Sequence, residues 1–505
     1  MIVCVFNLAI GSNLLFNSYE FIVWFLPTAL LIYFILGNKS PTWAGAWLLA
    51  CSLFFYGDAN PRFLPVLVNS FFLNYLFGLG LIQTWQRPKV SRLILATGVF
   101  CDLAILGYYK YSRFFSETIN PSWIQHWHLD QVVLPLGISF FTFTQIAFLV
   151  DASKGKIREC NPLHYALFVT YFPHLIAGPI LHHEEMIKQF EDRGCYKPSA
   201  ENLVAGFTIF AIGLFKKVGL ADPLAGYVAS AFHPRPAFLE AWGGVLSYTF
   251  QIYFDFSGYT DMAIGISLLF GFKLPINFNS PYRSVNIVDF WRRWHMTLSR
   301  FLRDYLYIPL GGGRQGAFRR FANIGVTMVL GGLWHGANWT FIAWGALHGA
   351  YLLINHGWNG LKIKTWWPKS EKTGFGDAAA TGLTFLAVMV GWVLFRAENI
   401  QVALSVLGGM TGLNGPASSP GAVTLGTVGW SRLAICLGIV WFIPNTRQFM
   451  GEISHCLGPK PPEERWMAPF RWSPTWFWIL AAVALFYGAM VGMTKEVHVF
   501  LYYQF

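Results

Sequence analysis

The chain has 505 residues, of which 54% are hydrophobic and only 12% are charged. Because soluble proteins carry about a quarter charged residues, this composition excludes an ordinary water-soluble fold and indicates a protein of the lipid bilayer. The net charge of +11 is spread over short segments between apolar blocks. This dispersion argues against nucleic-acid binding, for which basic residues gather on one face.

Apolar blocks of membrane-spanning length recur along the chain, since about 20 residues cross a bilayer as a helix. Residues 321–361 contain no Asp, Glu, Lys or Arg and are long enough for two crossings. We therefore expect an all-α polytopic transmembrane bundle of about 11 spans. The other predicted spans are residues 19–36, 42–57, 63–82, 93–109, 132–150, 203–220, 242–270, 381–395, 433–443 and 476–493.

Prolines and glycines interrupt the apolar pattern at several places. Irregular backbone is tolerated at membrane depth only when it is buried in protein or lines a cavity. We therefore expect re-entrant segments around a central tunnel, within one membrane domain that covers residues 1–505 and has its catalytic region at about 250–350. The interruptions are Pro173, Pro179, Pro275, Pro281 and residues 311–313.

Basic residues are concentrated in short polar connections, which should lie mainly on the cytoplasmic side by the positive-inside tendency. Residues 1–10 are apolar but lack a basic segment and a cleavage pattern, so we expect no cleaved signal peptide. The seven cysteines form no CxxC pair, and neither a metal site nor a disulfide framework is expected. The basic connections are residues 154–158, Lys216-Lys217, 283–303, 314–320 and 362–372.

Residues 289–307 mix arginines with tryptophan, phenylalanine and tyrosine. If this segment is one helix, Asp289 lies beside Arg292 and Arg293, and Trp291 shares a face with His295. Two interpretations follow. The helix is either an interfacial anchor, with its arginines on lipid phosphates, or the floor of a substrate cavity with His295 pointing inward.

His335 lies inside the charge-free block, beside Trp334 and close to Asn338 and Trp339. An ionisable residue inside an apolar span is costly, which makes it a functional candidate. A neutral imidazole can accept a proton from a hydroxyl at physiological pH and so act as a general base. A histidine that only hydrogen-bonds between two helices remains the alternative at this point.

Residues 285–313 and 331–338 resemble the bacterial branch of the membrane-bound O-acyltransferase family, and within it the alginate O-acetylase type. This branch also includes homologues that acetylate cellulose and peptidoglycan and the membrane subunit of teichoic-acid D-alanylation. Further similar stretches are Leu134-Pro-Leu-Gly-Ile-Ser-Phe-Phe, Phe172-Pro-His-Leu-Ile-Ala-Gly-Pro, Tyr253-Phe-Asp-Phe-Ser-Gly-Tyr-Thr-Asp and Phe500-Leu-Tyr-Tyr-Gln-Phe. The resemblance implies that His335 matches the catalytic histidine and His295 the second histidine of the family, both lining a tunnel across the membrane.

The resemblance also implies the substrates. The expected donor is acetyl-CoA or another acyl thioester on the cytoplasmic side, with no permanently bound cofactor. The expected acceptor is an extracytoplasmic polysaccharide, reached directly or through a periplasmic or membrane-anchored acetyltransferase partner. The expected location is a bacterial inner membrane, with lipids as neighbours. Alginate, cellulose and peptidoglycan stay open as polymers.

Other residues receive weaker assignments. Asn338 and the amides around Gly336 could donate to a developing oxyanion. Asp255 and Ser257 lie in an apolar run, and the favoured role for the carboxylate is structural, paired with arginines of the central segment; lining the acceptor route is the alternative. Aromatic walls could exclude water, or could be ordinary packing. Those wall residues are Trp294, Trp334 and Trp339, with His348 as a further tunnel residue.

Several activities lose support from missing motifs. The sequence has no Gly-x-Ser-x-Gly elbow, phosphate-binding Gly-x4-Gly-Lys loop or His-Glu-x-x-His zinc motif. Paired inverted halves, typical of secondary transporters, are also not evident. A lipid O-acyltransferase of the same superfamily remains the main alternative to polysaccharide acetylation.

Overall fold

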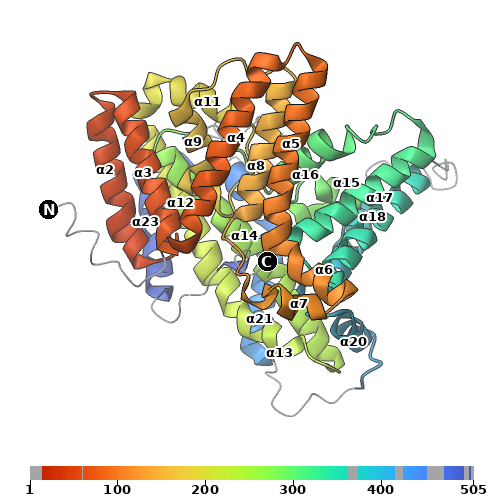
Figure 1. Ribbon diagram of the computed structural model, residues 1–505. Helices are drawn as coiled ribbons and strands as arrows, with labels where there is room; N and C mark the ends of the chain where they lie inside the picture. Colours follow the sequence, from red (N-terminus) through yellow and green to blue (C-terminus); the bar gives the residue numbers. More distant parts are fainter. Residues whose placement is uncertain are drawn as a thin grey trace.

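The computed structural model describes residues 14–59, 61–360, 374–415, 425–451, 471–493 and 500–501, and within these ranges every regular element is a helix (Figure 1). The all-α membrane fold predicted from the sequence is therefore confirmed. Residues 1–10, residues 362–372, Cys4, Cys456 and the last four residues, on which the sequence analysis drew, lie outside the described part.

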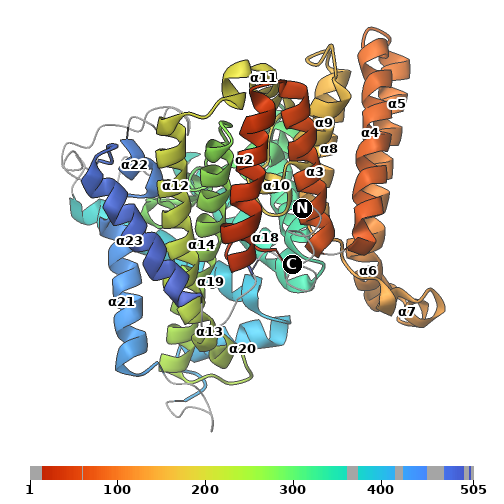
Figure 2. The ribbon, with the colours of Figure 1, turned by 90° about the vertical axis from the view of Figure 1, so that its left-hand side faces the viewer.

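The N-terminal region consists of two helical hairpins. The first joins α2 (Leu26–Gly37) to α3 (Pro41–Ala59), and the second joins α4 (Leu64–Thr84) to α5 (Pro88–Leu106) (Figures 1 and 2). The second hairpin packs on α8 (Ile138–Ser153). Asn74 of α4 fixes this contact, because its Nδ2 donates to Asp102 Oδ1 of α5 at 2.6 Å and to Gln145 Oε1 of α8 at 2.9 Å.

The centre of the molecule is the pair α12 (Ala200–Phe215) and α14 (Phe238–Leu269). α14 has 32 residues and is buried along nearly its whole length. Facing glycines allow the two backbones to touch: a Cβ on Gly213 would lie 2.6 Å from the carbonyl oxygen of Gly258, and one on Gly206 would lie 2.8 Å from that of Gly265. Small residues at such crossings are typical of helix packing in membranes.

A second close pair is the hairpin of α17 (Gly316–His335) and α18 (Trp339–Gly360). A Cβ on Gly332 would lie 2.2 Å from the carbonyl oxygen of Phe341, and one on Gly345 would lie 2.4 Å from that of Met328. Gly332 and Gly345 therefore permit close approach of the two backbones. This approach places the end of α17 against the start of α18.

The C-terminal helices cover the remaining sides of α14. α19, α20 and α21 pack against α14, while α23 packs against α12 on the outer face of the bundle (Figure 2). Their bounds are α19 (Gly374–Arg396), α20 (Ile400–Met410), α21 (Gly426–Phe442), α22 (Thr446–Met450) and α23 (Trp476–Gly492). The shorter helices are α9 (Pro162–Thr170), α10 (Phe172–Leu175), α11 (His183–Glu191) and α13 (Ala225–Ala231).

Every span predicted from the sequence coincides with a helix. Five helical runs are long and apolar enough to cross a membrane, namely Glu20–Gly37, Pro61–Thr84, Pro88–Ile119, Ala200–Ala231 and Gly376–Arg396, and four shorter helices are also apolar. The outer helices expose large apolar side chains, among them Trp476, Phe477 and Leu480 of α23. Such a surface suits hydrocarbon and not water, so the chain is a multi-pass membrane protein.

Three of the predicted interruptions lie in short or irregular segments of the bundle. Pro173 and Pro179 lie in a buried stretch around α10, and Pro275 lies in the extended segment that follows α14. Residues 311–313 differ from the prediction, because they form a partly exposed turn before α17. Gly311 and Gly312 have φ values of 107° and 57° there, which glycine adopts without strain.

Lys216 and Lys217 do not lie in a polar connection, which corrects the sequence interpretation. Both belong to the π-helical turn η7 (Lys216–Ala221), which continues α12 inside the bundle. Lys217 Nζ contacts Asp255 Oδ1 at 2.6 Å and Asp222 Oδ1 at 2.8 Å, and Lys216 Nζ contacts Asp261 Oδ2 at 2.6 Å. The lysines therefore neutralise carboxylates of α14 within the core.

Replacing Gly332 tests the α17–α18 contact. Gly332→Ala should lower the free energy of unfolding by about 1–3 kcal/mol, because the added methyl group overlaps a backbone carbonyl that cannot move away. Unfolding in mixed micelles of increasing SDS content measures the effect. The control is Gly325→Ala on the same helix, where a Cβ meets nothing within 4 Å and stability should be unchanged or slightly higher.

Replacing Lys217 tests the buried ion pairs. Lys217→Met should cost about 3–5 kcal/mol, because it leaves buried carboxylates without their cation. The matched control is Lys188→Met, which removes an ion pair to Glu184 whose side chains are 71% and 75% exposed and should cost at most about 1 kcal/mol. Equal losses in the two variants would contradict a stabilising role for the buried pair.

Candidate active site

His335 is the last residue of α17, and its side chain is buried. Helix α18 supplies Trp344 and α19 supplies Phe395, whose ring centroids both lie 5.1 Å from that of the imidazole. Both rings meet the imidazole at steep angles, 89° for Trp344 and 69° for Phe395. Three helices thus hold His335 between aromatic faces.

His295 occupies a sharp turn, and not a position within a continuous helix as the sequence suggested. The segment divides into α15 (Ile287–Trp291) and α16 (Met296–Leu302), and His295 between them has a φ of 41°. The break is stabilised by the neighbouring extended segment, because Asn279 N donates to Arg293 O and Met296 N donates to Asn277 O. The predicted Asp289–Arg293 ion pair is present at 3.0 Å, whereas Arg292 is exposed.

Asn277 orients His295, and the sequence analysis did not identify it. Its Oδ1 lies 3.3 Å from His295 Nδ1, 2.7 Å from Thr297 Oγ1 and 3.2 Å from Thr297 N. The main-chain amide can only donate, so the Asn277 atom in contact is the oxygen. His295 Nδ1 must then carry the proton, which leaves Nε2 as the acceptor of a neutral imidazole.

The structure brings the two predicted histidines together from positions 40 residues apart. Their ring centroids are 6.4 Å apart at an interplanar angle of 56°. Phe256 of α14 packs edge-on against His295 with a centroid distance of 4.8 Å. At this separation the imidazoles are too distant for a direct hydrogen bond, but they can contact one bound group from two sides.

Other predicted lining residues divide into two groups. Trp294, Trp334 and His348 are buried around the histidines. Asn338 and Trp339 are not buried in this group. Asn338 Nδ2 donates to Glu398 O and its Oδ1 accepts from Thr340 N. The Trp339 side chain is 53% exposed. Asn338 therefore stabilises the start of α18, and its side chain is engaged there, so a role as oxyanion donor stays a prediction without support from these contacts.

Trp344 is a better donor candidate, and the sequence analysis did not single it out. Its Nε1 is buried and has no hydrogen-bond partner within the described residues, and the same holds for both ring nitrogens of His348. The Trp344 and His348 ring centroids are 4.8 Å apart. Orphaned buried polar atoms require an explanation, and a substrate with polar atoms provides one.

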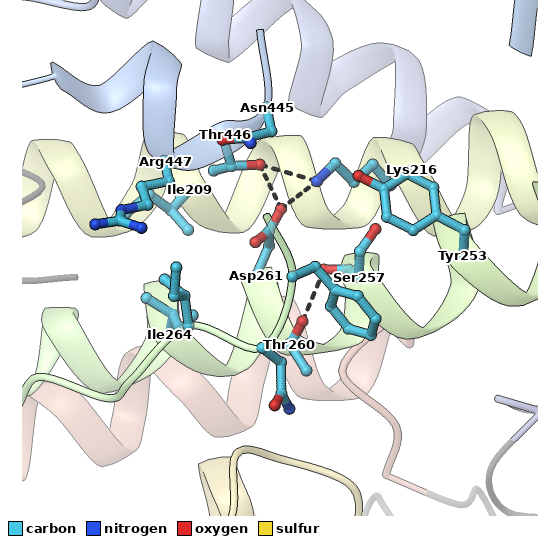
Figure 3. A pocket seen from close by; sticks show the side chains of 13 residues that line it. Ile209, Lys216, Tyr253, Ser257, Thr260, Asp261, Ile264, Asn445, Thr446 and Arg447 are labelled. Carbon is cyan, nitrogen blue, oxygen red and sulfur yellow. Dashed lines mark hydrogen bonds and ion pairs between the residues drawn. The ribbon is translucent and has the colours of Figure 1, made fainter. Parts of the chain in front are cut away.

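Asp255 has a structural role, as favoured from the sequence, but with different partners. It pairs with Lys217 and not with arginines of the central segment, and its Oδ2 accepts from Leu501 N at 3.0 Å. Ser257 lines a small polar cavity with Asp261, Lys216 and Asn277 (Figure 3). This cavity reaches the residue that orients His295.

The described residues contain no group of three or more His, Cys, Asp or Glu side chains that could hold a metal ion. The site consists instead of imidazoles, indoles and phenyl rings. An imidazole among these side chains is sufficient for general-base catalysis on a hydroxyl group.

Comparison with known proteins places the chain in a family. The model of the membrane-bound O-acyltransferase family matches residues 110–376, more than half of the chain. This range includes His295, His335, Trp344 and Lys110.

Curated relatives match over most of their length. Peptidoglycan O-acetyltransferase of Helicobacter pylori is 46% identical over 80% of this chain and 80% of its own. Probable alginate O-acetylase AlgI of Pseudomonas putida is 42% identical over 79% of this chain and 80% of its own. Teichoic acid D-alanyltransferase of Bacillus subtilis is 32% identical over 66% of this chain and 88% of its own. The chain therefore belongs to the membrane-bound O-acyltransferase family and is an O-acyltransferase.

Proposed function

We propose that the protein transfers a short acyl group, acetyl in the simplest case, from a thioester to a hydroxyl, with His335 as general base. The observation that carries this proposal is the pairing of His335 and His295 at a centroid distance of 6.4 Å in a buried, aromatic site. Two neutral imidazoles in such surroundings can accept and hold a proton without a metal or a nucleophilic side chain.

The reaction divides into attack and collapse. His335 takes the proton of the acceptor hydroxyl while its oxygen forms a bond to the thioester carbonyl carbon. The carbonyl electron pair moves to oxygen, and the buried Trp344 Nε1 is placed to donate to it. The pair then returns, the carbon–sulfur bond breaks, and the thiolate takes the proton from His335.

Water must be excluded, because it would hydrolyse the thioester. The rings of Trp294 and Trp392 are tilted against each other with centroids 4.8 Å apart, and Trp344 stacks on Trp392 at a centroid distance of 6.2 Å. All three indoles are buried. This wall keeps the reacting atoms in a medium of low polarity, where a hydrogen bond to the developing oxyanion stabilises it more than in water.

We propose an extracytoplasmic polysaccharide as the final acceptor and acetyl-CoA or another acyl thioester as the cytoplasmic donor. The names of the relatives, which refer to peptidoglycan and alginate, support a polymer acceptor. Transfer proceeds directly or through a periplasmic or membrane-anchored acetyltransferase partner. We propose a bacterial inner membrane as the corresponding location, since the similar proteins come from the bacteria H. pylori and P. putida.

A lipid hydroxyl is the second candidate acceptor. An apolar cavity of about 690 Å³ lies between α12, α21 and α23, and it shares Lys216 and Asn445 with the polar cavity beside Asn277. A hydrocarbon chain would fit its lining of isoleucine, phenylalanine and alanine. Labelled acetyl recovered in the lipid extract, with none in polymer or partner protein, would favour this candidate.

The catalytic role of His335 is tested by His335→Ala in proteoliposomes supplied with a radiolabelled acetyl thioester. Transfer to polymer or partner should fall by about 10²-fold or more, because no other group removes the hydroxyl proton. His126→Ala, at an exposed position in α7 (Ser122–His126), is the control and should retain full activity. Unchanged transfer by folded His335→Ala would refute the assignment.

A further inference from the structure

The last turn of α17 has an unusual set of hydrogen-bond partners. A helix leaves its final carbonyl groups without intrahelical donors. The chain turns sharply after His335, and the last i to i−4 main-chain hydrogen bond of α17 runs from Gly336 N to Gly332 O at 3.4 Å. The carbonyl groups of Leu333, Trp334 and His335 therefore depend on donors from elsewhere.

Two consecutive residues, Lys110 and Tyr111, provide these donors. Lys110 Nζ lies 2.5 Å from Trp334 O and 3.3 Å from His335 O, while Tyr111 Oη donates to Leu333 O at 2.9 Å. All three orphaned carbonyl groups thus receive a side-chain bond. The pair comes from the π-helical turn η4 (Gly107–Tyr111), between α5 and α6 (Ser112–Ile119).

Local geometry explains how neighbours in sequence reach one helix end. A π-helical turn widens the helix and shifts the direction of the side chains that follow, and such turns are frequent at functional sites. Lys110 Nζ also contacts Ser139 Oγ of α8 at 3.1 Å and lies 5.9 Å from the centre of the Trp334 ring. The ammonium group therefore joins η4, α8 and the end of α17.

The charge of Lys110 has no carboxylate within ion-pair distance in the described part of the chain. Burying a cation inside a membrane protein costs free energy, so such a residue is a functional candidate by default. A cation at a helix C-terminus is stabilised by the negative end of the helix dipole. The positive charge of Lys110 thus interacts with the C-terminal end of α17, the helix that carries His335.

We propose that Lys110 is a positioning residue, which together with Tyr111 holds the last turn of α17 and thereby sets the direction of the His335 imidazole. The proposal rests on the proposed role of His335 as base. Because His335 is the final helical residue, fraying by one residue would move its ring relative to His295 and to the bound substrates. A displacement of about 1 Å in a reacting group costs about 10²-fold in rate.

The decisive comparison is among Lys110→Met, Lys110→Gln and Lys110→Arg in the purified full-length protein. Lys110→Met should lower kcat by about 10–100-fold with the KM for the acetyl thioester unchanged, because the donor still binds but the base is misplaced. Lys110→Arg, which keeps both charge and donors, should recover most of the loss. Lys110→Gln keeps donors without charge and should fall between them.

Tyr111→Phe provides a variant that removes a single hydrogen bond and keeps the ring. It should fold normally and lower kcat by about 3–10-fold, again without a change in KM, so the proposal remains testable if Lys110→Met does not fold. Lys154→Met is the matched control: Lys154 Nζ also lies 5.9 Å from an aromatic ring, that of Tyr305, but in the described part of the chain its ammonium group makes no hydrogen bond to α17, and the kcat of this variant should be unchanged.

The outcomes separate the two proposals. Folded Lys110→Met with the kcat of the unmodified protein would overturn the positioning role. So would a loss that appears only in KM, or one that Lys110→Arg does not recover. His335→Ala is assayed in the same preparation. If it is inactive, a contrary result from the Lys110 variants overturns only the positioning role and leaves the proposed function intact. If it is active, the proposed function fails and the positioning role fails with it.

Discussion

Main-chain polar groups in the hydrocarbon region of a membrane have no water to bind, so each interruption of a helix needs a partner from elsewhere in the protein. The site is formed by two such interruptions. α17 ends at His335, and Lys110 and Tyr111 bind its last carbonyl groups. The helix pair α15 and α16 breaks before His295, and the extended segment with Asn277 and Asn279 binds the exposed main chain.

The same constraint explains why the two histidines are well oriented. A side chain within a regular helix takes its direction from the helix, but a side chain at a break takes it from the groups that satisfy the break. Asn277 accepts from Thr297 N and lies against His295 Nδ1, which fixes both the ring direction and the tautomer. Asn277 thus both satisfies a main-chain donor at the break and orients the side chain of His295.

Much of the fold could be predicted, because each membrane-spanning helix is specified by one continuous apolar stretch of the sequence. A run of about 20 apolar residues has one solution in a bilayer, and all predicted spans are helices. His335 was identifiable because an imidazole stands out in a block without charged residues. The resemblance of the central motif to a known family supplied the expectation that His335 is catalytic and that His295 is its partner.

The sequence-based predictions that the structure did not match have a common physical cause. Proximity in the sequence does not determine where a side chain points or which group it contacts. Asn338 is three residues from His335 but bonds to Glu398 and Thr340. The break at His295 contains neither glycine nor proline, so nothing in the segment itself indicates a φ of 41°. Asn277 and Trp344 act through contacts between distant segments, and a single sequence carries no signal for those contacts.

Charge is distributed in two distinct ways within the bundle. On α14, Asp255 and Asp261 are neutralised by Lys217 and Lys216, and a neutral pair produces little field at a distance. Lys110 binds only neutral acceptors, so its positive charge is not cancelled locally. The paired charges of α14 thus stabilise the bundle, whereas the charge of Lys110 lies at the end of the helix that carries His335, where it binds the negative end of the helix dipole.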